Sequence, residues 1–157
     1  MKYIKLIILT LCLISTSLKA QSLREAEINW LTFEALTDSL ERNPKPVFIF
    51  IHTDWCVYCK KMFNETFQDA AVINKMNQHY YAVNFDAEQT DTIRFDHALF
   101  TNPEKRKKRA KYHNLAKILI GEKNKPVFPV SILLDKDFYM KDRKFTYLSK
   151  EQLLKFL

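Results

Sequence analysis

The feature that most constrains the fold is an apolar run followed closely by two cysteines. Residues 47–51 read Val-Phe-Ile-Phe-Ile, and continuous runs of this kind are typical of a central parallel strand buried on both faces. Cys56 and Cys59 follow with two residues between them, and Met62 and Phe63 then mark one face of a helical pattern. The cysteine pair is therefore expected where a central strand passes into a helix.

The rest of the chain alternates between strand and helix patterns, and this order predicts an α/β sheet with crossover connections. Asp69 is expected to cap a helix, and Ser149-x-x-Gln152 has the form of a capping box. The further expected elements are a short strand or turn at 28–31, a helix at 33–40 ended by Asn43-Pro44, a helix at 70–76, a strand at 81–85 ending at Asp86, a helix of about three turns over 112–119, a strand at 130–134, an antiparallel partner from 138–140, and a helix at 150–157.

Residues 87–109 form a long, polar and weakly patterned connection. Connections of this length in small domains are uncommon without structure of their own, so we expect a structured insertion here. The chain has one glycine, Gly121, which falls just past the expected helix over 112–119, at the usual C′ position. With one glycine, neither Gly-rich phosphate-binding loop can be written.

The first twenty residues have the pattern of a secretory signal peptide. Met1–Lys5 is basic, residues 6–14 are apolar apart from Thr10, and residues 15–20 end in the small residue Ala20. The apolar stretch is too short to span about 30 Å of hydrocarbon as a helix, which argues against a membrane anchor. We expect cleavage after Ala20, a mature domain over 21–157, and a periplasmic or secreted protein.

The formal net charge is +7, and much of the excess lies in residues 105–111, where six of seven side chains are basic. Such a run either contacts an acidic partner or anionic lipid or is a solvated loop. Nucleic acid is not expected as a partner of an exported protein.

The cysteine pair has a specific chemical use at a helix N-terminus. Cys12 leaves with the signal, so the mature chain keeps Cys56 and Cys59, which can form a disulfide in an oxidising compartment. Free N–H groups and the helix dipole lower a thiol pKa from about 8.5 toward 7 or below. Cys56 is thus expected to be the attacking thiolate, and Cys59 the thiol that resolves a mixed disulfide. Trp55 offers a flat apolar surface beside them.

These motifs resemble the thioredoxin superfamily over roughly residues 28–157, most closely its exported bacterial members. The resemblance implies an α/β thioredoxin-like fold, a central mixed β-sheet flanked by helices, with the insertion placed before the cis-proline strand. It also implies a cis-proline at Pro129 that faces the disulfide, binds substrate backbone and keeps metals away, with Trp55 and Phe128 framing the substrate. The residues that carry it are Asp54-Trp55-Cys56-Val57-Tyr58-Cys59-Lys60 and Phe128-Pro129-Val130-Ser131.

The resemblance further implies a thiol–disulfide oxidoreductase that exchanges its dithiol with protein substrates. It requires no cofactor, acts as a monomer, and needs a redox partner such as a membrane electron carrier. Two departures stand out. Val57-Tyr58 replaces the Gly-Pro of thioredoxins proper, and Phe50 stands where thioredoxins have a buried aspartate that assists proton transfer.

Other readings of the cysteines remain open. The pair could be a structural disulfide or half of a zinc site, although zinc usually needs four ligands. His52 lies four residues before Cys56 and could join a metal site, but a packed or solvated histidine is favoured, so no metal is expected. The other histidines receive no role. The alternative function is a non-catalytic module that binds a metal ion or a partner protein through Cys56 and Cys59.

Overall fold

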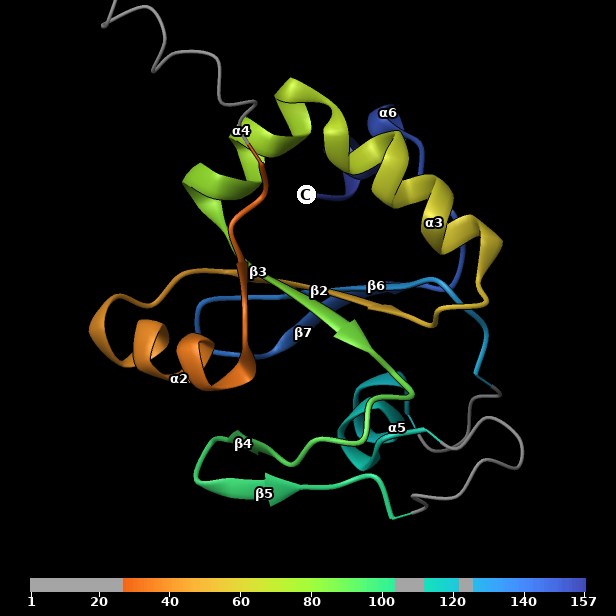
Figure 1. Cartoon of the computed structure of the whole chain (residues 1–157). Helices are drawn as coiled ribbons and strands as arrows, with labels where there is room; N and C mark the ends of the chain where they lie inside the picture. Colours follow the sequence, from red (N-terminus) through yellow and green to blue (C-terminus); the bar gives the residue numbers. More distant parts are fainter. Residues whose placement is uncertain (1–26, 104–111, 122–125) are drawn as a thin grey trace, which may run out of the picture.

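The architecture is a five-stranded mixed sheet with helices on both faces (Figure 1). The structure, a computed structural model, describes residues 27–103, 112–121 and 126–157. The strand order is β1-β3-β2-β6-β7, in which β3 runs parallel to both β1 and β2, whereas β6 is antiparallel to both β2 and β7. The expected thioredoxin-like α/β fold is confirmed. The strands are β1 Trp30–Leu31, β2 Val47–His52, β3 Tyr81–Asp86, β6 Val130–Leu134 and β7 Met140–Lys144.

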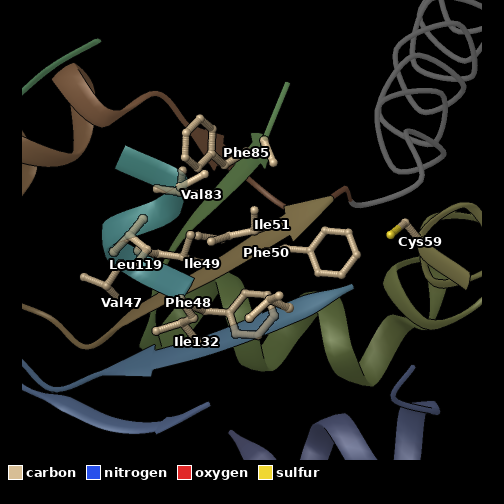
Figure 2. Close-up of a cluster of buried hydrophobic side chains, with 14 of the residues drawn as sticks. Val47, Phe48, Ile49, Phe50, Ile51, Cys59, Val83, Phe85, Leu119 and Ile132 are labelled. Atoms are coloured by element: carbon tan, nitrogen blue, oxygen red, sulfur yellow. The ribbon is translucent and has the colours of Figure 1, made fainter. Parts of the chain in front are cut away.

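The central strand β2 is the apolar run that the sequence singled out, and its side chains from Val47 to Ile51 are fully buried on the two faces of the sheet. Phe48 and Phe50 contact Phe67 and so lie on one face. Helices α3 (Val57–Asn64), α4 (Ala70–His79) and α6 (Lys150–Phe156) cover this face. Helices α2 (Phe33–Arg42) and α5 (Asn114–Ile120) cover the other face, where Leu119 approaches Val47 and Ile49 (Figure 2).

Two of the helix starts follow the sequence-based expectation. The Asp69 carboxylate accepts from the backbone N–H groups of Ala71 and Val72 at the start of α4. Ser149 and Gln152 form the expected capping box of α6. Because these caps depend on neighbours in sequence, they could be recognised without knowledge of the fold.

Helix α5 is shorter than expected. It has 7 residues, about two turns, because the His113 side chain caps its start and Gly121 ends it. Gly121 has φ 89° and ψ 125°, so it has the positive φ expected at C′ but not the left-handed helical ψ. Tyr112 lies outside the helix and packs on Phe128, and Ile118 is 56% exposed. The longer helix was expected because Tyr112 and Ile118 fit a helical apolar pattern, but the first lies outside the helix and the second is exposed.

The insertion has structure of its own, as expected. It contains an antiparallel hairpin of β4 (Ile93–Phe95) and β5 (Ala98–Phe100), separate from the main sheet. Asp96 and His97 connect the strands with φ values of 48° and 60°, the backbone of a tight two-residue hairpin turn. Phe95 packs on Phe33 of α2 at 5.2 Å, so the hairpin is attached to the domain.

Two expectations concern segments outside the described residues: the signal peptide over 1–20 and the basic run over 105–111. Of the helices within 27–103, 112–121 and 126–157, none has the length and apolar character needed to span a membrane.

Candidate redox site

Cys56 and Cys59 form a disulfide at the start of α3, with the sulfur atoms 2.02 Å apart. Cys56 is the N-cap residue of this helix, and its Sγ accepts a hydrogen bond from the backbone N–H of Cys59 at 3.1 Å. The backbone N–H of Cys56 donates to the Thr53 carbonyl. Cys56 is 4% exposed and Cys59 is 1% exposed, so Cys56 is slightly the more accessible of two buried residues.

The position of Cys56 favours negative charge on its sulfur. A helix N-terminus carries partial positive charge and unpaired N–H donors. The first turn of α3 contains no acidic residue, and Lys60 adds a cation one residue beyond the pair. Once reduced, the Cys56 sulfur can therefore hold a thiolate at lower pH than an ordinary cysteine.

The Phe128–Pro129 peptide bond is cis, as the resemblance implies. Pro129 directly precedes β6, whose Val130 pairs with Ile51 near the end of β2. The chain leads from that end of β2 into the cysteines, so Pro129 lies at the same edge of the sheet as the disulfide. Trp55, which is 57% exposed, meets Phe128 edge to face at 5.9 Å. The structure thus brings all five expected site residues to one edge of the sheet.

Two residues that the sequence did not single out for the site also lie here, Glu88 of the insertion and Tyr112, which follows it. Glu88 accepts a hydrogen bond from the Trp55 indole N–H at 3.1 Å, and the ring of Tyr112 lies 5.2 Å from that of Phe128. Burial and the nearby Glu88 carboxylate raise the pKa of Tyr112. One signal could have indicated Glu88: it follows the end of β3, and the carboxyl ends of parallel strands meet at one edge of a sheet.

The floor of the site is aromatic. Phe50 is fully buried, its ring lies 5.2 Å from Phe63 of α3, and the Cys59 sulfur points toward it (Figure 2). An apolar ring therefore occupies the position where the family's buried acid is expected. Chemistry that needs a proton acceptor or a hydrogen-bond donor below Cys59 must use another group.

His52 packs against this aromatic floor. Its ring stacks on Phe50 at 5.9 Å and meets Phe63 edge to face at 5.1 Å. Burial lowers the pKa of His52, while the Asp86 carboxylate and a hydrogen bond with Asn84 oppose that shift. Among the residues that the structure describes, no group of three or more His, Cys, Asp and Glu is placed to hold a metal ion.

The two residues between the cysteines are exposed and helical. Val57 is 75% exposed and Tyr58 is 61% exposed, and both belong to α3. The Tyr58 ring lies 6.3 Å from that of Tyr147 at a tilted angle. With Trp55, these residues form an apolar rim beside the disulfide.

Comparison with known proteins agrees with this geometry. A family model described as thioredoxin-like domain matches residues 33–157. The thiol:disulfide interchange protein DsbD of Pectobacterium atrosepticum is 40% identical over 43 residues, a match that spans 27% of this chain and only 8% of that protein.

Solved structures share the fold at low sequence identity. A DsbH oxidoreductase superposes with a TM-score of 0.56 at 17% identity, over 83% of this chain and 81% of that one. A thioredoxin from Thermus thermophilus also gives 0.56, at 13% identity, over 82% of this chain and 83% of that one. Both similarities concern the arrangement of strands and helices.

Proposed function

The chain belongs to the thioredoxin-like domain family, and from this we propose that it is a thiol–disulfide oxidoreductase that exchanges the Cys56–Cys59 pair with protein substrates. The observation that carries the proposal is the disulfide itself, which lies at the N-terminus of α3. A purely structural disulfide would not require this position, whereas a redox pair benefits from the helix terminus.

Exchange proceeds in two steps. In the reducing direction, the Cys56 thiolate attacks a substrate disulfide, forming one mixed disulfide and releasing one substrate thiolate, which takes up a proton. Cys59 then loses its proton and attacks the Cys56 sulfur, which restores the Cys56–Cys59 bond and releases the second substrate thiolate. The substrate gains two electrons and the protein loses two. The slightly greater exposure of Cys56 and its N-cap position support this assignment of roles.

Trp55, Phe128 and Pro129 frame the substrate. Trp55 and Phe128 form one aromatic wall, and Pro129 follows Phe128 through a cis peptide bond at the start of β6. The exposed apolar side chains of Val57 and Tyr58 continue this surface. A partner segment that carries a cysteine among apolar residues suits this surface.

The protein acts outside the cytoplasm, as a monomer, after cleavage of residues 1–20. The basic, apolar and polar order of that segment supports export. Its electrons come from, or pass to, a second thiol–disulfide protein such as a membrane electron carrier; the similarity to part of DsbD supports such a partner. Mass spectrometry of the protein from a periplasmic extract should find an N-terminus at Gln21, and a retained Met1 would contradict export by cleavage.

Reduction of insulin by dithiothreitol tests the activity. We expect the wild type to accelerate precipitation of the insulin B chain, Cys56→Ser to abolish the acceleration, and Cys59→Ser to accumulate a mixed disulfide with insulin. Met140→Ser is the control, because it changes an exposed sulfur-containing residue of β7 outside the pair and should leave the acceleration unchanged. A wild type that does not accelerate reduction but binds zinc tightly through Cys56 and Cys59 would favour the alternative, a non-catalytic binding module.

A further inference from the structure

Ser131 is a fully buried polar residue whose environment calls for an explanation. Its side chain is 0% exposed, and its Oγ has no hydrogen-bond partner among the residues that the structure describes. Buried hydroxyl groups in folded proteins nearly always have a partner, and exceptions often mark functional positions. Ser131 belongs to β6, which begins directly after the cis-proline.

The pairing of the strands places this hydroxyl on the same side of the sheet as α3. Ser131 lies directly opposite Phe50 in the antiparallel pair of β6 and β2, and directly opposed residues project from the same face. The Phe50 ring contacts Phe63 of α3, so Ser131 projects toward α3 as well. Cys59 is the fully buried cysteine of that helix, and its sulfur points toward Phe50 (Figure 2).

The position along β6 places Ser131 at the disulfide end of this face. Side chains alternate along a strand, so Ser131 is the first β6 residue on the α3 face and Leu133 is the second. Leu133 pairs with Phe48, which contacts Phe156 of α6, farther along the sheet. Ser131 is thus the polar residue that β6 places on the α3 face, at the end of the strand that lies toward the disulfide.

We propose that Ser131 donates a hydrogen bond to the Cys59 sulfur when the disulfide is reduced, and so stabilises the Cys59 thiolate. This rests on the proposed function, which supplies the two electrons that break the sulfur–sulfur bond. In the oxidised state the sulfur shares its electrons with Cys56 and accepts only weakly. In the dithiol state it can carry a full charge, and a donor to the charged form lowers the pKa of the thiol.

The consequence differs from that of a buried acid. A carboxylate below Cys59 would repel the thiolate when ionised and would have to be protonated or hydrogen-bonded to be tolerated. Phe50 removes that charge, and Ser131 provides a neutral donor in the facing strand. Cys59 therefore reaches its attacking form without a second titrating group.

The test measures the pKa of Cys59 directly, in a Cys56→Ser background that leaves this thiol free. The rate of alkylation by iodoacetamide is followed against pH. We expect Ser131→Ala to raise the Cys59 pKa by about one unit, which is a tenfold lower thiolate fraction below that pKa. Ser131→Thr keeps the hydroxyl and should keep the pKa. Leu133→Ala is the matched control, because it removes a side chain from the same strand and face and should not shift the pKa.

An unchanged pKa in Ser131→Ala overturns the proposal, and so does an equal shift in Leu133→Ala. If the alanine variant does not fold, Ser131→Val fills the site without a donor and is judged by the same result. The readout needs no substrate. Failure of the wild type in the insulin assay would overturn the proposed function while leaving the pKa comparison to decide the role of Ser131.

Discussion

At the scale of single residues, the two cysteines differ more in position than in exposure. Cys56 caps α3 and its sulfur accepts from the backbone N–H of Cys59, whereas Cys59 lies inside the helix. We expect limited iodoacetamide at pH 6 to 7 to modify Cys56 of the reduced protein at least tenfold faster than Cys59. Peptide mass spectrometry measures the ratio, and preferential modification of Cys59 would reverse the proposed roles.

His113 is a buried histidine with a structural role that requires the neutral ring. Its Nδ1 accepts from the Leu115 N–H, its Nε2 lies 3.1 Å from the Asp91 carbonyl and donates to it, and its ring meets Phe85. Burial lowers the pKa of His113, and the nearby Lys117 adds to the shift against two opposing backbone hydrogen bonds. The cap links the insertion to α5.

The lowered pKa of His113 makes stability depend on pH. The pKa of His113 is lower in the folded protein than the value of about 6.5 in the unfolded chain. The contribution of the neutral ring to the free energy of unfolding is therefore complete above about pH 6.5 and is lost as the pH falls below that value. His113→Asn can keep the cap but loses the hydrogen bond to the Asp91 carbonyl, so we expect a cost of about 1 kcal/mol at pH 7.5. The variant should also have a shallower loss of unfolding free energy between pH 7 and 5. Urea unfolding measures both. His79→Asn, at an exposed histidine, is the control, and an unchanged pH slope in His113→Asn would contradict the role.

The residues that the sequence predicted are those whose signal is local. The Cys-x-x-Cys spacing, the Asp69 cap and the proline before β6 can each be recognised from a few neighbours. Glu88 and His113 could not be recognised in this way, because each makes its contact with an element distant in sequence. Ser131 belongs to the motif that carries the resemblance, but its place opposite Phe50 follows only from the pairing of the strands.

At the scale of elements, the insertion is joined to the redox site by Glu88. Its carboxylate accepts from the Trp55 indole, and Asn102 donates to the Glu88 carbonyl and so holds this segment in place. The sequence predicted that residues 87–109 contain structure, but not this link, because the hydrogen bond joins two residues that are far apart in sequence. We infer that the insertion orients the aromatic wall of the substrate site.

Glu88→Ala tests this role of the insertion. Losing the acceptor frees the Trp55 ring, so we expect the KM for a protein substrate to rise about three- to tenfold while kcat changes less. Glu88→Gln retains an acceptor and should remain near wild type. Glu34→Ala is the matched control: Glu34 accepts from the Arg94 N–H elsewhere on the insertion, so its loss should lower stability without raising KM. Equal KM values in the Glu88→Ala variant and wild type would contradict the link.

At the scale of the whole molecule, the alternation of strands and helices predicted the α/β class, and the resemblance predicted the mixed sheet. The order β1-β3-β2-β6-β7 pairs strands that are distant in sequence, and no local pattern specifies those pairs. The length of α5 was overestimated for a related reason. Tyr112 is apolar in pattern because it packs on Phe128 across the site, not because it continues a helix.

The same arrangement bears on the reduction potential of the whole domain. The dithiol state gains a Cys56 thiolate at a helix N-terminus without an acid in the first turn, and Phe50 places no negative charge below Cys59. Stabilising the reduced form makes a dithiol pair more oxidising. We therefore expect a potential less negative than the value of about −270 mV known for thioredoxin. Equilibration with glutathione buffers measures it, and a value at or below about −270 mV would contradict this electrostatic account.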